Sequence, residues 1–374
     1  MVTTSDRMAG AEKSIYDLLR LIDQNTYEPR LVIFKHEKNG ELTDKVRALG
    51  IRTESIGIQL KWQFFKLVKL WKVIREFRPD ILESFLYFDN QVCRLMGRLA
   101  KVPVVISGLQ NIETKQSTFR KFVDQLTARY VDAVVSNSDA GKDLYVSRNY
   151  LPPEKVFIAK SGIDLEQLKE LQSHHVRNDL HRLVFEIEIP KDHQVLFTVG
   201  FLTEQKGTIY LIRALKCLKD HGRKIICFIA GQGHLQEMFD REVRELGISD
   251  TVHFLGYVKS SYQYLPLFDM FVLPSLWEGL PNVIIEAMAS RVLVVATNVG
   301  GVSELITDGV TGFLSKPADA QEFAWKIEQA LDLPTNVRAR ILESAYQHII
   351  KSFTTESMVA AYISCYEHLL QAKR

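Results

Sequence analysis

The chain has 374 residues, 46% of them hydrophobic and 25% charged, with a formal net charge of +2. This composition is typical of a globular protein with room for two domains. The chain has no run of eighteen apolar residues and no signal-peptide pattern at its start, so we expect a cytoplasmic protein. The well-separated Cys93, Cys217, Cys227 and Cys365 indicate neither a zinc site nor a disulfide framework.

Charge is distributed unevenly along the chain. Residues 1–170 carry 27 Lys and Arg against 22 Asp and Glu, whereas residues 171–374 carry 20 against 23. This basic excess is slight for a nucleic-acid-binding protein, and no nucleic-acid-binding motif is present. We therefore expect no nucleic-acid partner.

The first half alternates short apolar runs with helical segments, which predicts an α/β domain over residues 1–162. Its strand candidates are RLVIFK, DILESF, VPVVISG, DAVVSNS and KVFIAKSG. Residues 163–192 are polar and partly helical, which predicts a connection into a second domain over residues 163–354. This connection contains His174, His175 and His181, which we interpret as solvated because no other metal-ligand residue stands at a suitable spacing.

Residues 60–79, LKWQFFKLVKLWKVIREFRP, carry six basic residues and one acid. Helical periodicity predicts a sheet-facing side formed by Phe64, Leu67, Val68, Trp71 and Ile74. The opposite side would hold Lys61, Lys66, Lys69 and Lys72, with Trp62, Phe65 and Val73 among them. Such a mixture is typical of a helix at an anionic membrane surface, while an ordinary helix with a solvated basic face explains it equally well.

Five apolar runs in the second half each close on glycine. They are VLFTVG, IICFIAGQG, VHFLG, MFVLPSLWEG and VLVVATNVGG. Continuous apolar strands are buried on both faces, which predicts a doubly wound parallel sheet with helices above and below. Ligands bind at the carboxyl ends of such strands, where glycine lets backbone N–H groups approach a phosphate. Residues 355–374 form an amphipathic helix, which we expect to dock back on the first domain.

The stretch SLWEGLPNVIIEAMAS (275–290) connects two of these strands. Pro281 suits the first position of a helix, so we expect the helix to begin there, at the ligand edge of the sheet. The N–H groups at Gly279, Leu280 and Asn282 and the positive end of the helix dipole would suit a phosphate or a sugar. Glu278 and Glu286 would accept hydrogen bonds from hydroxyl groups; a capping acid and a surface glutamate are the alternative interpretation.

The stretch EGLPNVIIEAMA and the following VVATNVGGVSELITDGVTGFL resemble the donor-binding signature of the family 4 retaining glycosyltransferases, which have the GT-B fold. AGAEKSIYDLL, SNSDAGKDL, KVFIAKSGID and VGFLTEQKG are also similar, so the resemblance covers nearly the whole chain. It implies two Rossmann-like domains that face each other across a cleft. The second would bind a UDP- or GDP-sugar and the first a polysaccharide or lipid-linked glycan acceptor, without metal or cofactor.

The resemblance gives Glu286 the ribose hydroxyls, Glu278 a place beside the transferred sugar, and Lys206 the departing diphosphate. A fixed cation suits that role because negative charge grows on the diphosphate as the sugar leaves. Phe201 stands where many members have a second cation, an arginine. The other implied donor-site residues are Gly200, Gly231, Gly233, Val258, Gly279, Leu280, Pro281 and Asn282.

The first domain departs from the family pattern at two places. A glycine pair is reduced to Ala9 and Gly10, where Gly10 would approach the donor phosphates. No histidine follows VVISG, so Gln110 or Asn111 would hydrogen-bond a sugar hydroxyl instead. These departures leave open a catalytically weak or inactive sugar-nucleotide-binding protein on the same fold. Another GT-B enzyme, an epimerase or a phosphorylase, is disfavoured by the two-glutamate helix.

The resemblance also implies a complete strand before TSDRMAGAE, where only MVTT stands. The first strand of a Rossmann-like domain is central and paired on both sides. Its absence would expose two strand edges and part of the core. We therefore expect a chain that is truncated at its start and lacks this strand.

Overall fold

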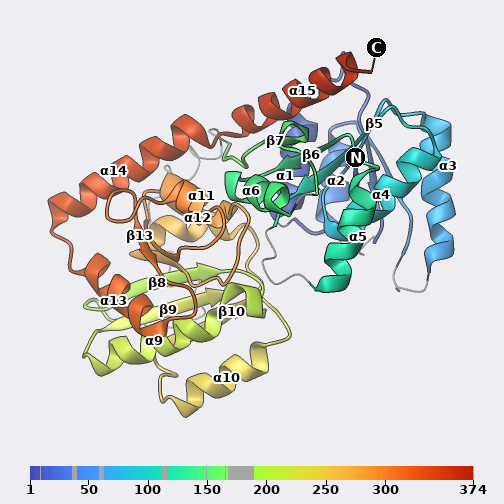
Figure 1. Cartoon of the computed structure of the whole chain (residues 1–374). Coiled ribbons are helices and arrows are strands. Elements are labelled where there is room, and N and C mark those ends of the chain that lie inside the picture. Colours follow the sequence, from blue (N-terminus) through green and yellow to red (C-terminus); the bar gives the residue numbers. More distant parts are fainter. Residues whose placement is uncertain are drawn as a thin grey trace. The chain divides into compact units, whose positions relative to one another are not determined.

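The computed structural model describes residues 1–8, 10–35, 40–58, 63–111, 117–148, 150–164, 166 and 189–373. They form two compact units, one of residues 1–162 with 355–374 and the other of residues 163–354 (Figure 1). Each unit contains one parallel sheet with helices packed on both faces. Outside the described residues lie His174, His175 and His181.

The sheet of the first unit has seven parallel strands in the order β3-β2-β1-β4-β5-β6-β7. The chain runs outward from β1 to β3, returns to the centre at β4 and continues toward the other edge. The order reverses between β1 and β4, and such a switch point is where doubly wound sheets bind their ligands. The strands are β1 (Val2–Thr3), β2 (Arg30–Ile33), β3 (Arg52–Ser55), β4 (Ile81–Ser84), β5 (Val104–Leu109), β6 (Ala133–Ser136) and β7 (Val156–Ile158).

Strand β1 lies in the centre of this sheet although it has only two residues. Val2 pairs with Val32 of β2 and with Ser84 of β4, and Thr3 pairs with Ile33. Val2 and Thr3 are both buried. The expectation that this strand is missing is therefore wrong, because two residues are enough to bridge the neighbouring strands.

Two layers of helices cover the first sheet. Val104 and Val105, successive residues of β5, pack into different layers, as the period of two along a strand requires. One layer consists of α1 (Gly10–Leu21), α2 (Glu41–Ala48) and α15 (Thr355–Gln371). The other consists of η1 (Phe64–Lys66), α3 (Leu67–Phe77), α4 (Tyr87–Leu99), α5 (Thr118–Ala128) and α6 (Asp139–Ser147).

Helix α15 is part of the core of the first unit. Its Tyr366 is buried, and the Tyr366 hydroxyl donates a hydrogen bond to Oε2 of Glu83 in β4. Burial raises the pKa of the Glu83 carboxyl to about 7, and the bond from Tyr366 opposes this only in part. Nε2 of Gln110, which follows β5, donates to the Tyr362 hydroxyl at 3.3 Å. The helix is thus tied to two central strands by polar as well as apolar contacts.

The basic segment forms α3 with a different face toward the sheet from the one predicted. Leu70, Val73 and Ile74 are buried, whereas Val68 and Trp71 are 56% and 38% exposed. The segment has two apolar stripes, and its periodicity alone does not say which one the sheet covers. No helix among the described residues is long and apolar enough to span a bilayer. Outside the described part of the chain lie Lys61, Trp62 and the side chain of Phe64.

The sheet of the second unit has six parallel strands in the order β10-β9-β8-β11-β12-β13. It repeats the winding of the first sheet, with its switch point between β8 and β11. Strands β8 to β12 coincide with the five predicted apolar runs, so the doubly wound α/β fold is confirmed. The strands are β8 (Gln194–Val199), β9 (Ile225–Ala230), β10 (Val252–Gly256), β11 (Met270–Leu273), β12 (Leu293–Thr297) and β13 (Phe313–Ser315).

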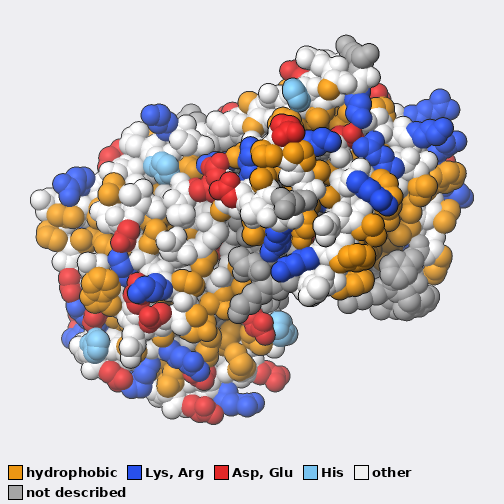
Figure 2. Space-filling model, in the orientation of Figure 1, with side chains coloured by type: hydrophobic (Ala, Val, Ile, Leu, Met, Phe, Trp, Pro, Cys, Tyr) orange, Lys and Arg blue, Asp and Glu red, His pale blue; other side chains and the backbone are white. Residues whose placement is uncertain are grey.

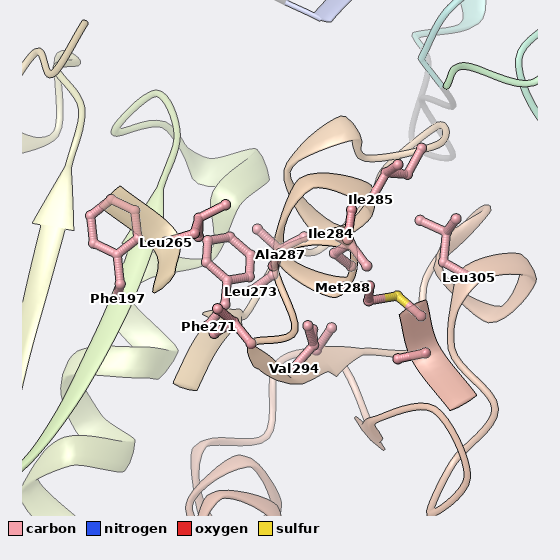
Figure 3. Close-up of a cluster of buried hydrophobic side chains, with 14 of the residues drawn as sticks. Phe197, Leu265, Phe271, Leu273, Ile284, Ile285, Ala287, Met288, Val294 and Leu305 are labelled. Carbon is pink, nitrogen blue, oxygen red and sulfur yellow. The ribbon is translucent and has the colours of Figure 1, made fainter. Parts of the chain in front are cut away.

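Helices cover both faces of the second sheet as well. Figure 3 shows Ala287 and Met288 of α11 among Leu273 and Val294 of the strands, and all four side chains are buried. This packing anchors the helix that carries Glu286. One face is covered by α9 (Thr208–Asp220), α10 (Gln236–Glu245) and α13 (Ala320–Leu331). The other is covered by η5 (Ser261–Leu267), α11 (Asn282–Ala289), α12 (Val302–Leu305) and α14 (Thr335–Ser352).

Candidate functional site

Two loops flank the switch point of the second sheet, one after β8 and one after β11. The first contains the 3-10 helix η4 (Glu204–Lys206). Across the switch point, Nζ of Lys206 donates to Oε1 of Glu278 at 2.6 Å. The two side chains are 20% and 7% exposed, so water screens this ion pair only weakly. The topology thus joins the two residues to which the resemblance gives the transferred sugar and the diphosphate.

Backbone contacts fix these two loops against each other. The N–H of Leu276 donates to the carbonyl of Gln205 at 2.7 Å, and Nε2 of Gln205 donates to the carbonyl of Trp277 at 3.1 Å. Gly207 has a φ of +59°, and a Cβ there would lie 2.1 Å from the carbonyl oxygen of Pro274. Only glycine permits this approach, so the ion pair is held by the backbone on both sides.

Glu278 is supported by the end of β11 and by the loop after β12. The hydroxyl of the buried Ser275 donates to the same Oε1 at 2.6 Å. Gly300 has a φ of +51°, and a Cβ there would lie 1.9 Å from the carbonyl oxygen of Glu278. The N–H of Gly301 donates to the carbonyl of Gly279 at 2.8 Å. Because a carboxylate has about four acceptor sites, Glu278 retains capacity for a ligand hydroxyl.

Helix α11 begins at Asn282, one residue later than predicted, because Pro281 is extended and forms the N-cap. In the first turn, the N–H of Ile284 donates to the carbonyl of Pro281 at 3.0 Å. Glu286 lies in the second turn and is only 9% exposed, since residues 284–289 are all buried. Leu280 is buried in the same apolar cluster. A helix N-terminus and a second buried carboxylate therefore follow directly after the ion pair.

Three predicted donor-site glycines lie where neighbouring loops pack closely and leave little room for a side chain. A Cβ at Gly231 would lie 1.8 Å from the carbonyl oxygen of Gly200, and one at Gly233 would lie 2.1 Å from that of Leu202. A Cβ at Gly200 would lie 3.1 Å from Cε of Lys206. Packing of the loops after β8 and β9 thus accounts for glycine at these positions without reference to a ligand.

The segment after β10 completes this edge of the second sheet. The N–H of Gly231 donates to the carbonyl of Gly256 at 2.7 Å, which joins the ends of β9 and β10. Val258 is half-buried against the apolar cluster that contains Leu280. The implied donor-site residues Gly231, Gly233 and Val258 therefore lie after two neighbouring strands, β9 and β10.

In the first unit, the loop after β1 reaches across the switch point to α4. Asp89 of α4 accepts hydrogen bonds from the backbone N–H of Thr4, at 2.8 Å, and from the Thr4 hydroxyl. Burial raises the pKa of the Asp89 carboxyl to about 7. Asp6 of the same loop accepts from the N–H and hydroxyl of Thr43, at 2.9 and 2.6 Å. These bonds fix the loop that leads into Gly10, the first residue of α1.

The two predicted acceptor-side residues differ in their surroundings. Gln110 is half-buried and its side-chain amide donates to Tyr362, whereas Asn111 is exposed at the end of β5. Asn111 is thus the more accessible of the two to a ligand. Within the described ranges, no group of three or more His, Cys, Asp or Glu side chains is placed to hold a metal ion.

Comparison with known proteins identifies the family. Residues 8–167 match the family model described as Glycosyltransferase Family 4, and residues 181–348 match the one described as Glycosyl transferases group 1. The chain belongs to the family 4 glycosyltransferases. The resemblance seen in the sequence is thereby confirmed.

Curated relatives of this glycosyltransferase cover most of its length. The UDP-Gal:alpha-D-GlcNAc-diphosphoundecaprenol alpha-1,3-galactosyltransferase of Escherichia coli is 24% identical over 330 residues, covering 84% of this chain and 83% of the relative. The GalNAc-alpha-(1->4)-GalNAc-alpha-(1->3)-diNAcBac-PP-undecaprenol alpha-1,4-N-acetyl-D-galactosaminyltransferase of Campylobacter jejuni is 25% identical over 345 residues, covering 90% of this chain and 89% of the relative. Both names describe transfer of a sugar.

Solved structures share the architecture at lower identity. Anabaena HepE in complex with UDP and glucose aligns with a TM-score of 0.82 at 20% identity, over 98% of this chain and 99% of that one. Sucrose-phosphate synthase from Thermosynechococcus elongatus aligns with a TM-score of 0.81 at 17% identity, over 99% and 98%. Together with the two parallel sheets, these alignments confirm the GT-B fold of this family 4 glycosyltransferase.

Sequence reasoning missed three residues that shape the site of this glycosyltransferase. Gln205 bonds the two loops, Ser275 supports the Glu278 carboxylate, and Gly300 allows the third loop to approach. Each lies in a quoted motif, namely EQKG, LPSLWEG or TNVGG. The motifs gave the right loops, but a one-dimensional pattern does not specify which atoms meet between them.

Proposed function

We propose that this glycosyltransferase is a retaining enzyme that transfers a sugar from a nucleotide-diphosphate sugar to a polysaccharide or lipid-linked glycan acceptor. The observation that carries the proposal is the partly buried Lys206–Glu278 pair at the switch point, next to the N-terminus of α11. It combines a cation, a carboxylate and helix N–H groups, which suit a diphosphate and a sugar. A UDP- or GDP-sugar is the donor class that fits.

In this proposal Lys206 stabilises the leaving group. The bond between the anomeric carbon and the diphosphate oxygen breaks through an oxocarbenium-like state. The oxygen of an acceptor hydroxyl bonds the same face of the sugar, and its proton passes to the departing diphosphate oxygen. Negative charge then grows on the diphosphate, and a cation fixed before the reaction needs no reorganisation to stabilise it. An ammonium group has three N–H donors, so Nζ can keep its bond to Glu278 while it donates to a phosphate oxygen.

The two carboxylates hold hydroxyl groups of the donor. Glu286 binds the ribose hydroxyls and Glu278 binds the transferred sugar. Both glutamates are nearly buried, and a charge-assisted hydrogen bond gains strength where water is excluded. The reaction proceeds without a metal ion in this proposal, so chelation with EDTA is expected to leave donor turnover unchanged.

The proposed acceptor class is supported by the names of the relatives and by features of the first unit. The names of the Escherichia coli and Campylobacter jejuni relatives specify undecaprenol-linked glycans. A lipid-linked acceptor of this class would be met at the inner face of the cytoplasmic membrane. Asn111 hydrogen-bonds an acceptor or donor hydroxyl, and residues 60–79 contact the anionic lipid peripherally.

Donor binding can be tested without knowledge of the acceptor. A thermal-shift panel of UDP, GDP and ADP and their sugars identifies the base, since ligand at 100 times its dissociation constant adds about 2.7 kcal/mol of stability. Glu286→Ala should weaken binding of the selected nucleotide by roughly 1.5–3 kcal/mol, because a charge-assisted acceptor is lost. Glu237→Ala, on the exposed side of α10, is the matched control. Unchanged affinity in folded Glu286→Ala would refute the ribose role.

The alternative function is a sugar-nucleotide-binding protein with little or no turnover. The observation that favours it is Phe201, a 53% exposed apolar side chain at the position of the family's arginine. Incubation with the selected donor and pooled lipid-linked glycans distinguishes the two functions. A glycosylated product whose anomeric configuration matches the donor supports the retaining enzyme, and tight binding without hydrolysis or transfer supports the alternative.

A further inference from the structure

The exposed apolar side chains of this protein are concentrated on one helix layer of the first unit. Of the fifteen exposed large hydrophobic residues in the described ranges, nine belong to η1, α3, α4 and α5. The layer covers one face of the sheet, with α3 against α4 and α4 against α5. The nine are Phe65, Val68, Trp71, Phe88, Leu95, Leu99, Phe119, Phe122 and Leu126.

Each helix of the layer carries its exposed apolar residues as a stripe. In α5, Phe119, Phe122 and Leu126 follow the spacing i, i+3, i+7 and are 74%, 60% and 46% exposed. In α4, Leu95 and Leu99 are one turn apart and are 43% and 68% exposed. The helices therefore have a second apolar side that faces solvent, in addition to the side that packs on the sheet.

In this layer most exposed charged side chains are basic, whereas two acidic side chains are buried. On η1, α3, α4, α5 and the loops that join them, the exposed basic residues outnumber the exposed acids, which among the described residues are Glu76 and Asp80; the exposed Asp139 and Asp143 belong to α6. The acids Asp89 and Asp124 of α4 and α5 are buried instead. Figure 2 shows basic and hydrophobic side chains interspersed over the part of the molecule that carries α3 and α5 in Figure 1. The exposed basic residues are Lys69, Lys72, Arg75, Arg78, Lys101, Arg120, Lys121 and Arg129.

Buried hydrogen bonds fix the helices of this layer to one another and to the sheet. The exposed apolar side chains therefore do not result from incomplete packing. The buried Arg94 of α4 donates to Asp124 at 3.1 Å and to Thr127 at 3.0 Å, both in α5. It also donates to Ser107 of β5 at 3.0 Å and to Tyr145 of α6 at 2.7 Å. One guanidinium thus fixes three helices and a strand relative to one another, and the outward stripes form a constant surface.

We propose that the outer surface of α3, α4 and α5 is a docking surface for an anionic phospholipid bilayer, with Phe119 and Phe122 as the side chains that insert. Aromatic and aliphatic side chains would enter the headgroup region while the surrounding Lys and Arg contact lipid phosphates. This occupant is favoured over a protein because the exposed charge around the apolar stripes is mainly basic. The surface extends beyond residues 60–79, since α4 and α5 contribute six of its nine apolar residues.

Docking in this way would also supply the acceptor. In a parallel α/β unit each helix starts at the edge where the preceding strand ends. Phe88 in the first turn of α4 and Phe119 in that of α5 therefore lie toward the edge that carries Asn111. This consequence rests on the proposed function: a lipid-linked glycan would reach the first unit from the bilayer on which it docks. The docking itself does not depend on the reaction.

Vesicle flotation tests the proposal without donor or turnover. The wild-type chain should float with phosphatidylcholine vesicles that contain phosphatidylglycerol, and less with phosphatidylcholine alone or at high salt. The double variant Phe119→Ser and Phe122→Ser should partition at least about tenfold more weakly. Replacement of Arg120 and Lys121 by Ser should weaken partition to anionic vesicles and not to neutral ones. The matched control replaces Met238 and Trp325, exposed apolar residues of the second unit, by Ser.

Circular dichroism melting and the nucleotide thermal shift, measured on every variant, confirm that both units remain folded. Wild-type protein that stays unbound with anionic vesicles overturns the proposal, as does equal loss in the Met238 and Trp325 control. Oligomers that disappear in the Phe119 and Phe122 variant, without vesicle binding by the wild type, also overturn it and identify a protein interface instead. A failed proposed function would leave flotation intact and abolish the nucleotide shift, so the two failures are distinguishable.

Discussion

Replacement of Lys206 by Ala tests whether the ion pair at the switch point is catalytic or only structural. Lys206 donates to Glu278 at 2.6 Å, and the proposed reaction places the growing diphosphate charge next to the same ammonium. If the proposal is right, turnover falls by about 10²–10³, the loss typical when one donor to a developing charge is removed. Donor affinity should fall less, because the diphosphate gains negative charge only as the sugar departs.

The structural cost of the substitution follows from the burial of the pair. Breaking a fully buried ion pair costs roughly 3–5 kcal/mol, and an exposed pair contributes about 0–1 kcal/mol. With side chains 20% and 7% exposed, Lys206 and Glu278 lie between these limits, and Ser275 still donates to the carboxylate in the variant. We therefore expect Lys206→Ala to lower the free energy of unfolding by about 2 kcal/mol.

A neutral pair separates the two effects. The double variant Lys206→Met and Glu278→Gln removes both charges and keeps similar volumes, so most of the lost stability should return while turnover stays low. Lys216→Ala is the matched control, because Lys216 pairs with Asp220 on the exposed side of α9. Urea unfolding and single-turnover transfer are measured on each variant. Recovery of turnover together with stability in the double variant would show that Lys206 acts only through folding.

Two further predictions concern stability. The pKa of Glu83 rises from 4.5 to about 7 in the folded protein, so its contribution to stability is present below pH 4.5 and lost as the pH rises through 7. Glu83→Gln should therefore remove up to about 3 kcal/mol of pH dependence in urea unfolding, and an unchanged dependence contradicts this. Gly300→Ala should cost more than the roughly 1–2 kcal/mol of a left-handed residue, because its Cβ meets the Glu278 carbonyl. Gly309→Ala, with a φ of +73° and open space around it, should cost only that amount.

Most of the strands that could be predicted from sequence are buried on both faces. The runs that became β8, β9, β11 and β12 are continuous and apolar because helices cover both sides of the sheet. The edge strand β10 is mostly half-buried and was predicted from its run VHFLG, which closes on glycine. The missed strands are short or lie at an edge. Strand β3, with the sequence RTES, is half-exposed, and β13 has only three residues. An edge strand needs no apolar side chains to complete its backbone hydrogen bonds, so its sequence carries little signal.

The sequence motifs predicted which loops of the second unit form the candidate site. They did not predict most of the contacts between those loops. Glycine at 231 and 233 is required by the backbone of the loop after β8, which makes these positions recognisable in the sequence. The direct bond between Lys206 and Glu278 depends on strand order, since residues separated by more than seventy positions become neighbours only when β8 and β11 pair. The α3 face was predicted wrongly because two apolar stripes compete in one segment, and only the sheet decides between them.

The switch points of the two units have the same strand connectivity, but the groups that donate hydrogen bonds across them differ in charge. In the first unit, Asp89 after β4 accepts a hydrogen bond from Thr4 in the loop after β1. In the second unit, Glu278 after β11 accepts one from Lys206 in the loop after β8. The donors to Asp89 are neutral, and burial favours its protonated form at a pKa of about 7. The donor to Glu278 is an ammonium that keeps two further N–H groups. In the proposed function, the donor diphosphate is stabilised by a cation and would gain little from a buried acid, which favours the second unit over the first as its binding site.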